Sequence, residues 1–243
     1  MTRRPTISRR AVILAGGLGT RLRPYTLELP KPLMPLGEYP ILEVIVRQLK
    51  NRGFGHITLA VNHQAELIAA YFGNGEKWDL RIDYSREDKP LGTMGPLRLI
   101  ADLPENFLVM NGDTLTDLDY AGFLDAHVAA KNLFTISSFV REHRVDYGVL
   151  EPDESRRLAG FREKPVLTYE VSMGVYAVSR SVLPVIPPDR NYGFDELMLD
   201  LIAHKTPALV ARHAGYWLDI GRPDDYAQAI EDFDKMSSQL LHA

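Results

Sequence analysis

The sequence predicts an α/β fold in which a mostly parallel, mixed sheet lies between layers of helices. Short uninterrupted apolar runs, such as Ala11–Leu14 and Phe107–Met110, are typical of strands that are buried on both faces. These runs alternate with amphipathic helical segments along the chain, as a parallel sheet requires. A length of 243 residues, 45% of them apolar, is enough for one substantial core, so we expect one domain over 1–243.

The alternation is clearest in the first half of the chain. Ile41–Arg52 has apolar residues at helical spacing and ends before Gly53, which suits a helix stop. The elements predicted for this half are strand Ala11–Leu14, helix Ile41–Arg52, strand His56–Val61, helix Gln64–Phe72, strand Arg81–Tyr84, loop Lys89–Pro96, helix Leu97–Ala101 and strand Phe107–Met110.

The second half is richer in strands, and we expect hairpins among them. Its last helix opens with Pro223 and two acidic residues, which suit a first helical turn. The elements predicted for this half are strands Phe134–Val140, Gly148–Glu151, Leu158–Glu163 and Val171–Val178, and helices Phe194–His204 and Asp224–Gln239.

Charge and cysteine content exclude several classes of function. The formal net charge is −4 and there is no long basic run, so neither nucleic acid nor an anionic membrane surface is an expected partner. No apolar run is long enough to span a membrane, and no secretory signal pattern is present. The chain has no cysteine and therefore no disulfide framework. We expect a cytoplasmic protein.

A glycine-rich turn follows the first strand. Gly16, Gly17 and Gly19 allow the backbone to bend tightly and to bring its N–H groups close to an anion. Glycine also marks ordinary turns, but the nearby cations Arg21 and Lys31 favour phosphate binding. Neither the dinucleotide fingerprint nor the Walker loop fits, because Leu22 replaces the small third residue of the first and no Gly-Lys-Ser/Thr ends the second.

Two aspartates are candidate metal ligands. Asp113 follows an apolar strand, where α/β sheets place their ligands, although it could instead cap a helix or bond a turn. Asp219 has apolar neighbours, and a buried charge there would need a partner. A magnesium ion held by two carboxylates and substrate phosphates would satisfy both aspartates.

The segment Ala15-Gly16-Gly17-Leu18-Gly19-Thr20-Arg21-Leu22-Arg23-Pro24, followed by Pro30-Lys31-Pro32, resembles the signature of sugar-1-phosphate nucleotidylyltransferases. Further matching segments follow in the family's order as far as about Arg222. The resemblance implies a Rossmann-like, three-layer fold similar to that of GT-A enzymes, with a nucleotide-binding half at about 10–115 and a sugar-binding half at about 116–243. Many members carry a C-terminal left-handed β-helix, for which this chain ends too soon. A homodimer is compatible with that difference.

The resemblance also implies the reaction, in which NTP and a sugar 1-phosphate give an NDP-sugar and pyrophosphate, and the residues that perform it. Catalysis is assigned to Arg21 and Lys31, and Mg²⁺ to Asp113 and Asp219. The nucleotide-binding residues are Ala15, Gly16, Gly17, Gly19, Thr20, Arg21, Leu91, Gly92, Thr93, Asn111 and Gly112. The sugar-phosphate-binding residues are Gly148, Glu163, Lys164, Ser172 and Gly174. Ser172 departs from the family pattern, in which many members have Asn.

The substrates are the least defined part. Leu91–Gly95 resembles a loop of guanylyltransferases and also of related enzymes that use other nucleotides. Tyr169–Tyr176 and Tyr216–Arg222 resemble segments of guanylyltransferases, so we expect GTP, with mannose or a heptose-like sugar as the acceptor. A uridylyl- or thymidylyltransferase acting on a hexose 1-phosphate is the alternative. A GT-A glycosyltransferase would leave Arg21 and Lys31 without a use, and a non-catalytic nucleotide-sugar-binding regulator would not need both aspartates.

Overall fold

The computed structural model describes residues 9–17, 19–27, 29–62, 65–206 and 208–242. Its centre is a seven-stranded sheet, in which β11 runs antiparallel to both of its neighbours while all other neighbouring pairs are parallel. The predicted mostly parallel, mixed sheet is therefore confirmed. In spatial order the strands are β12 (Ala208–His213), β8 (Phe134–Arg144), β11 (Val166–Ser179), β6 (Asn106–Asn111), β1 (Arg9–Leu14), β4 (Phe54–Val61) and β5 (Arg81–Arg86).

Side chains of the central strands alternate between two hydrophobic cores, because successive strand residues point to opposite faces. In β1, Ala11 and Ile13 enter one core and Val12 enters the other. Four helices contribute to the first core: α1 (Ile41–Asn51), α2 (Ala65–Phe72), α3 (Tyr120–Ala130) and α5 (Pro223–His242). The second core contains α4 (Phe194–Ala203) and the 3₁₀ helix Gly95–Leu99. The three predicted layers are therefore present.

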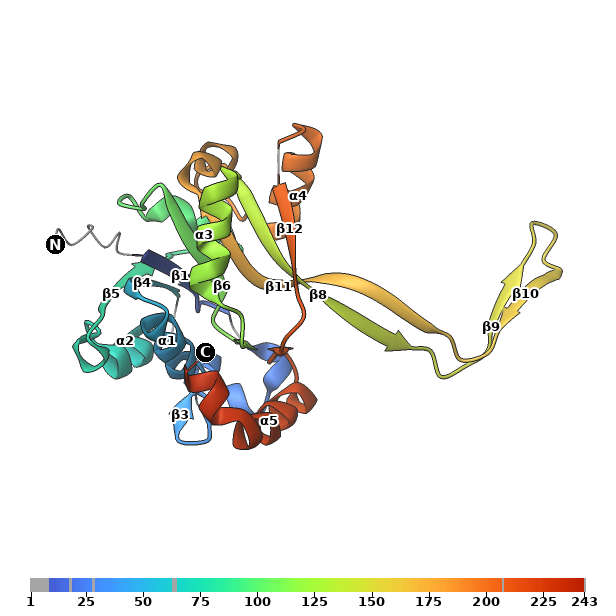
Figure 1. The fold of residues 1–243 in the computed structure, drawn as a ribbon, viewed down its shortest axis with the longest axis horizontal. Coiled ribbons are helices and arrows are strands. Elements are labelled where there is room, and N and C mark those ends of the chain that lie inside the picture. Colours follow the sequence, from blue (N-terminus) through green and yellow to red (C-terminus); the bar gives the residue numbers. More distant parts are fainter. Residues whose placement is uncertain (1–8, 18, 28, 63–64, 207, 243) are drawn as a thin grey trace.

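A long two-stranded arm projects from this body (Figure 1). It is formed where β8 and β11 continue beyond the sheet, paired as far as Arg144 and Val166. Its tip is the hairpin of β9 (Val149–Pro152) and β10 (Leu158–Arg162). We use the name "arm" for residues 141–170. The sequence predicted the four strands but not that two of them would leave the sheet.

Three other features differ from the predicted elements. The predicted helix at 97–101 is the short 3₁₀ helix at 95–99, which contains Pro96. Helix α3 was not predicted, although its buried residues Tyr120, Phe123, Leu124 and His127 follow helical spacing. The sequence also missed β12 and two small two-stranded sheets, which pair β2 (Pro35–Leu36) with β3 (Tyr39–Pro40) and β7 (Thr114–Thr116) with β13 (Trp217–Asp219).

Among the described residues, none of the helices combines the length and apolar character that a membrane crossing needs.

Candidate active site

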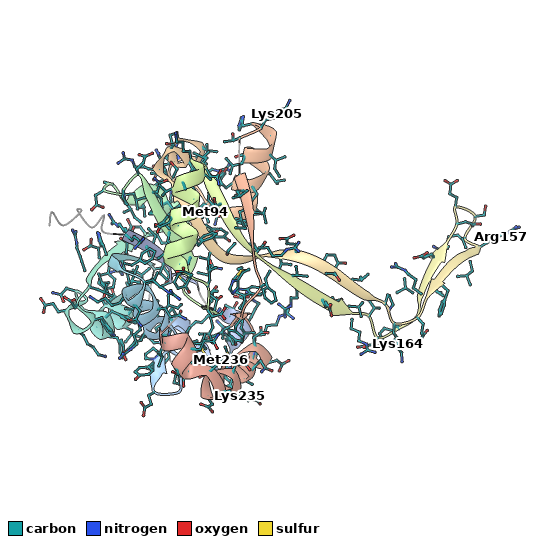
Figure 2. The ribbon with its side chains drawn as sticks, viewed as in Figure 1. Met94, Arg157, Lys164, Lys205, Lys235 and Met236 are labelled. Atoms are coloured by element: carbon teal, nitrogen blue, oxygen red, sulfur yellow. The ribbon has the colours of Figure 1, made fainter. Side chains whose placement is uncertain are left out.

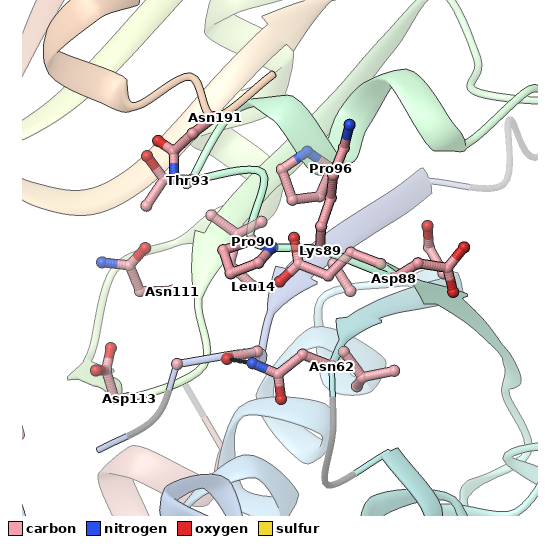
Figure 3. A pocket seen from close by; sticks show the side chains of 17 residues that line it. Leu14, Asn62, Asp88, Lys89, Pro90, Thr93, Pro96, Asn111, Asp113 and Asn191 are labelled. Carbon is pink, nitrogen blue, oxygen red and sulfur yellow. Dashed lines mark hydrogen bonds between the residues drawn. The ribbon is translucent and has the colours of Figure 1, made fainter. Parts of the chain in front are cut away.

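A cleft of about 540 Å³ opens at the carboxyl ends of β1, β4, β5 and β6 (Figure 3). This is the edge at which α/β sheets bind ligands, and the volume is that of a small-molecule site. The glycine turn after β1 forms part of its wall, and Asn111 and Asp113 lie together at one end. The cleft residues are Leu14, Gly16, Gly17, Ala60, Val61, Asn62, Ser85, Glu87, Asp88, Lys89, Pro90, Gly92, Thr93, Pro96, Asn111, Asp113 and Asn191.

Contacts from outside the glycine turn fix its path. Asn62 donates its side-chain amide to the carbonyl of Gly16, and Thr26 donates its hydroxyl to the carbonyl of Gly19 at 2.8 Å. Gly19 has a φ of 60°, a left-handed conformation that glycine adopts without strain. Side chains from the residue after β4 and from the 3₁₀ segment after the turn therefore hold the carbonyls of Gly16 and Gly19 in place.

Two of the residues assigned to nucleotide binding use their backbone N–H groups within the fold. The N–H of Ala15 donates to Ala60 at 2.8 Å, and that of Gly112 donates to Leu14 at 3.0 Å. A Cβ on Gly112 would lie 3.1 Å from the Leu14 carbonyl oxygen, so this position requires a very small residue. Ala15 and Gly112 therefore shape the wall, while Gly16 and Gly17 face the cleft directly.

The side chains of Lys31 and Asp113 form an ion pair at the end of the cleft. Lys31 opens a short 3₁₀ helix, and only 8% of its surface is exposed. The second oxygen of Asp113, Oδ1, is buried and has no hydrogen-bond partner among the described residues. A buried carboxylate oxygen without a partner is costly, so this atom is available for a ligand.

The second aspartate lies on the neighbouring strand. Asp219 pairs with Thr114 in the β7–β13 ladder, and the N–H of Ile220 donates to the Asp113 carbonyl at 3.1 Å. Burial, together with the negative charge of Asp113, raises the pKa of Asp219, while Lys31 and Arg21 oppose that rise. The structure thus brings together all four of the sequence-predicted residues Arg21, Lys31, Asp113 and Asp219.

Arg21 is exposed, and its guanidinium lies near enough to Asp219 for its charge to oppose the rise in the pKa of Asp219. A Cβ on Gly221 would lie 3.7 Å from Arg21 Nη2 and 3.1 Å from Asp219 Oδ2, so the guanidinium and the carboxylate share one small space. Leu22, next to it, is fully buried and anchors this part of the chain. Thr20 is exposed in the same short 3₁₀ helix.

The loop after β5 closes the other end of the cleft. Gly92 and Thr93 line it, whereas Leu91 is buried and its N–H donates to the Glu87 carboxylate at 3.0 Å. The Thr93 hydroxyl accepts the N–H of Phe194 at 2.7 Å, which ties this loop to the start of α4.

Several polar cleft residues were not predicted as site residues, among them Asn62, Glu87, Asp88 and Lys89. Each of these four follows the end of a parallel strand, β4 for Asn62 and β5 for the other three. Asp113 was predicted because α/β sheets place their ligands at the carboxyl ends of their strands, and the same reasoning applies to these four residues.

The residues assigned to the sugar phosphate are divided between two places. Ser172 and Gly174 lie in β11 beside the cleft, and a Cβ on Gly174 would lie only 2.5 Å from Asn111 Nδ2. Gly148, Glu163 and Lys164 instead lie on the arm, and Figure 2 shows Lys164 well away from the body. Within one chain, these three residues are not brought to the cleft.

Comparison with known proteins agrees with this architecture. Residues 10–236 match the family model described as nucleotidyl transferase. A UTP–glucose-1-phosphate uridylyltransferase from Synechocystis sp. is 33% identical, over 91% of this chain and 62% of its own length. A mannose-1-phosphate guanylyltransferase from Mycobacterium tuberculosis is 31% identical, over 91% of this chain and 64% of its own.

Among solved structures, HddC from Yersinia pseudotuberculosis superposes with a TM-score of 0.71 and is 29% identical, over 93% of this chain and 99% of its own. It has also been solved complexed with GMP-PN. The chain belongs to the nucleotidyl transferase family. It spans slightly less than two thirds of the length of the two curated relatives above.

Proposed function

We propose that this protein transfers a nucleoside monophosphate from an NTP to a sugar 1-phosphate and releases pyrophosphate. The observation that supports this proposal most directly is the grouping of four charged side chains beside a cleft with a glycine wall: Lys31, Asp113, Asp219 and Arg21. Two cations and two carboxylates at the end of a nucleotide-sized cleft suit the meeting of two polyanionic substrates. The family names of its relatives support the same reaction class.

The reaction requires positioning more than proton transfer. A phosphate oxygen of the sugar 1-phosphate attacks the α-phosphorus of the NTP, the bond from this phosphorus to the bridging oxygen breaks, and pyrophosphate leaves with the electron pair. The nucleophile is already ionised, so no general base is needed. The obstacle is repulsion between anions, which preorganised positive groups reduce.

Each cation has a position that suits a separate task. Buried Lys31 is held by its ion pair with Asp113 and would act as a point charge toward the α-phosphate and the attacking phosphate. Exposed Arg21 can take two oxygens of the triphosphate at once through its planar guanidinium. Gly16 and Gly17 would hold the phosphates through backbone N–H groups, and the cleft excludes part of the solvent.

The two aspartates fit a divalent cation such as Mg²⁺. Asp113 Oδ1 is buried without a partner, and the mutual repulsion with Asp219 would be relieved by a positive charge between them. When bound by these carboxylates, the ion would neutralise charge on the α-phosphate and orient both substrates. Hard oxygen donors of this kind suit Mg²⁺ better than softer metals.

GTP is the proposed nucleotide, and mannose 1-phosphate or a heptose 1-phosphate is the proposed acceptor. Support comes from the guanylyltransferase relatives and from HddC, which has been solved with GMP-PN. In addition, the carboxylate of Asp88 lines the end of the cleft away from Asp113, where it could accept the N1–H and N2–H₂ donors of guanine. UTP with a hexose 1-phosphate is the second candidate, because a uridylyltransferase is equally similar.

Pyrophosphate release measured with each of four NTPs, against mannose, heptose and glucose 1-phosphates, tests the proposal. Product should form only when both substrates and Mg²⁺ are present. Asp113→Asn should lower turnover at least about 100-fold, the cost of losing one preorganised electrostatic group. Asp125→Asn, the same change at an exposed position of α3, should leave turnover unchanged. Absence of product with every pair, or full activity of Asp113→Asn, would refute the proposal.

A further inference from the structure

The two candidate metal ligands lie on a small ladder outside the main sheet. Asp113 directly precedes β7, and Asp219 is the last residue of β13. These strands pair through three residues each, from Trp217 opposite Thr116 to Asp219 opposite Thr114. An isolated two-stranded ladder is marginal in water, so the position of this short one depends on contacts from other segments.

One carboxylate supplies such contacts at the end of the ladder away from Asp219. Asp117 directly follows β7, and its Oδ1 accepts the N–H of Tyr216, the residue before β13, at 2.7 Å. The same oxygen lies 2.7 Å from Nε2 of His213, the last residue of β12. Since a carboxylate only accepts, His213 is the donor in this contact. Oδ2 accepts the side-chain amide of Gln239 in α5 at 2.9 Å, so Asp117 joins four segments of the chain.

The surrounding chain leaves space for this cluster. The side chains of Asp117 and His213 are only 17% and 15% exposed. Gly215 lies against both of them, and a Cβ there would be 2.3 Å from Asp117 Oδ1 and 2.7 Å from His213 Nε2. Any side chain at position 215 would displace the carboxylate or the imidazole. The segment 213–216 thus provides two donors to Asp117 and the space that its carboxylate needs.

We infer that Asp117 is a positioning residue for the metal site, an inference that rests on the proposed function. The ladder is held by a different contact at each end. Beside the two ligands, the N–H of Ile220 donates to the Asp113 carbonyl at 3.1 Å, and at the far end Asp117 holds Tyr216. Tyr216 stands only three positions before Asp219. Asp117 stands four positions after Asp113, so its bond to Tyr216 limits the movement of one ligand relative to the other.

The register of the ladder decides where the second carboxylate points. Successive strand residues face opposite sides, so a slip of one residue would turn the Asp219 side chain to the other face. Asp117 resists such a slip together with Thr116, whose hydroxyl donates to the Tyr216 carbonyl at 2.7 Å. Because His213 belongs to β12, Asp117 also ties the ladder to the main sheet.

Direct measurement of metal binding tests this role without relying on turnover. Carboxylate oxygens suit Mn²⁺ as they suit Mg²⁺, and free hydrated Mn²⁺ has an electron paramagnetic resonance signal that is lost on binding. The wild-type chain should bind Mn²⁺, and Asp113→Asn should remove that binding. Asp117→Ala should raise the Kd for Mn²⁺ at least about 10-fold, the lower limit for losing a group that orients a metal ligand. The Mg²⁺ concentration that gives half-maximal turnover should rise by the same factor.

Two variants separate positioning from charge and from folding. Asp117→Asn keeps an oxygen that can accept the Tyr216 N–H, so its Kd for Mn²⁺ should stay close to the wild-type value although the charge is gone. Gly215→Ala keeps Asp117 but places a Cβ 2.3 Å from its carboxylate, so this Kd should rise. Gly215 does not have a positive φ, so alanine adds no backbone strain there. Gly215→Ala is also the deciding variant should Asp117→Ala not fold.

A second carboxylate–imidazole pair provides the matched control. His56 Nε2 and Asp83 Oδ2 lie 2.6 Å apart between β4 and β5, at the edge of the sheet opposite β12. Asp83→Ala removes the same kind of contact and should leave the Kd for Mn²⁺ unchanged, whatever its effect on Tm. A loss of affinity equal to that of Asp117→Ala would show that both variants act through general instability, which would overturn the inference.

The remaining outcomes separate this inference from the proposed function. Wild-type affinity in Asp117→Ala, or in Gly215→Ala should the first not fold, would overturn the inference and leave the proposed function intact. Equal losses in Asp117→Asn and Asp117→Ala would overturn it as well, because charge rather than hydrogen bonding would then be responsible. A wild-type chain that binds no Mn²⁺, or an Asp113→Asn chain that still binds it, would refute the metal site of the proposed function and the inference with it.

Discussion

Replacing Gly174 by alanine should affect both stability and turnover, for two separate reasons. Gly174 has a φ of 76°, and an L-residue in the left-handed region costs about 1–2 kcal/mol. A domain of this size loses about 2–4 °C of Tm per kcal/mol, so the expected fall is about 2–8 °C. The new Cβ would also lie 2.5 Å from Asn111 Nδ2 and 3.1 Å from Asn111 Cγ, closer than real contacts allow.

The Asn111 side chain must therefore move, and it lines the cleft beside Asp113. Displacement of a substrate-positioning group by about 1 Å costs on the order of 100-fold in rate. We expect Gly174→Ala to lower turnover by about this factor, measured as pyrophosphate release with saturating substrates below the Tm of the variant.

Gly73→Ala separates the two effects. Gly73 follows α2, has a φ of 52°, and nothing lies within 4 Å of its added Cβ. This variant should show a similar fall in Tm with normal turnover. Equal turnover in both variants would refute the claim that Gly174 keeps space for Asn111, and an unchanged Tm in both would refute the backbone cost.

Three further variants test the charges. Asp219→Asn should abolish turnover. In chelator at pH 7 it should also raise the unfolding free energy by about 0.5–2 kcal/mol, because burial raises the pKa of Asp219 and the charged carboxylate opposes folding above that pKa. A variant with a lower Tm than the wild type would contradict this. Arg212 and Ser138 lower the pKa of Glu170 to about 2, so its stabilising effect is present above about 4.5 and lost as pH falls toward 2. Glu170→Gln should therefore weaken the dependence of Tm on pH in that range. If Tm falls with acid in the variant as steeply as in the wild type, the ion pair between Glu170 and Arg212 does not stabilise the fold. Arg21→Ala should lower turnover while the unfolding free energy changes by no more than about 0.5 kcal/mol, as for other exposed positions; an unstable variant with normal turnover would make Arg21 structural.

Local patterns were enough to locate much of the candidate site. The glycine turn and Asp113 follow apolar strands directly, and the position of a ligand at the end of such a strand is a consequence of strand and turn geometry alone. Lys31 and Asp113, however, stand 82 positions apart, and their ion pair depends on the parallel sheet that brings β6 beside β1. Sequence patterns show which residues are suitable, but not which ones meet.

The arm marks the opposite limit. Glu163 and Lys164 carry the same local pattern whether their hairpin folds over its own cleft or projects from the body, because alternation and turn residues specify a strand without specifying its neighbour. Helix α3 and β12 were missed for a related reason, since each is stabilised by packing against the sheet. The sequence by itself determined the layered sheet and the phosphate-binding turn through short-range geometry. Only the tertiary structure decided which charges share the cleft and which stand on the arm, because those positions depend on contacts between distant segments.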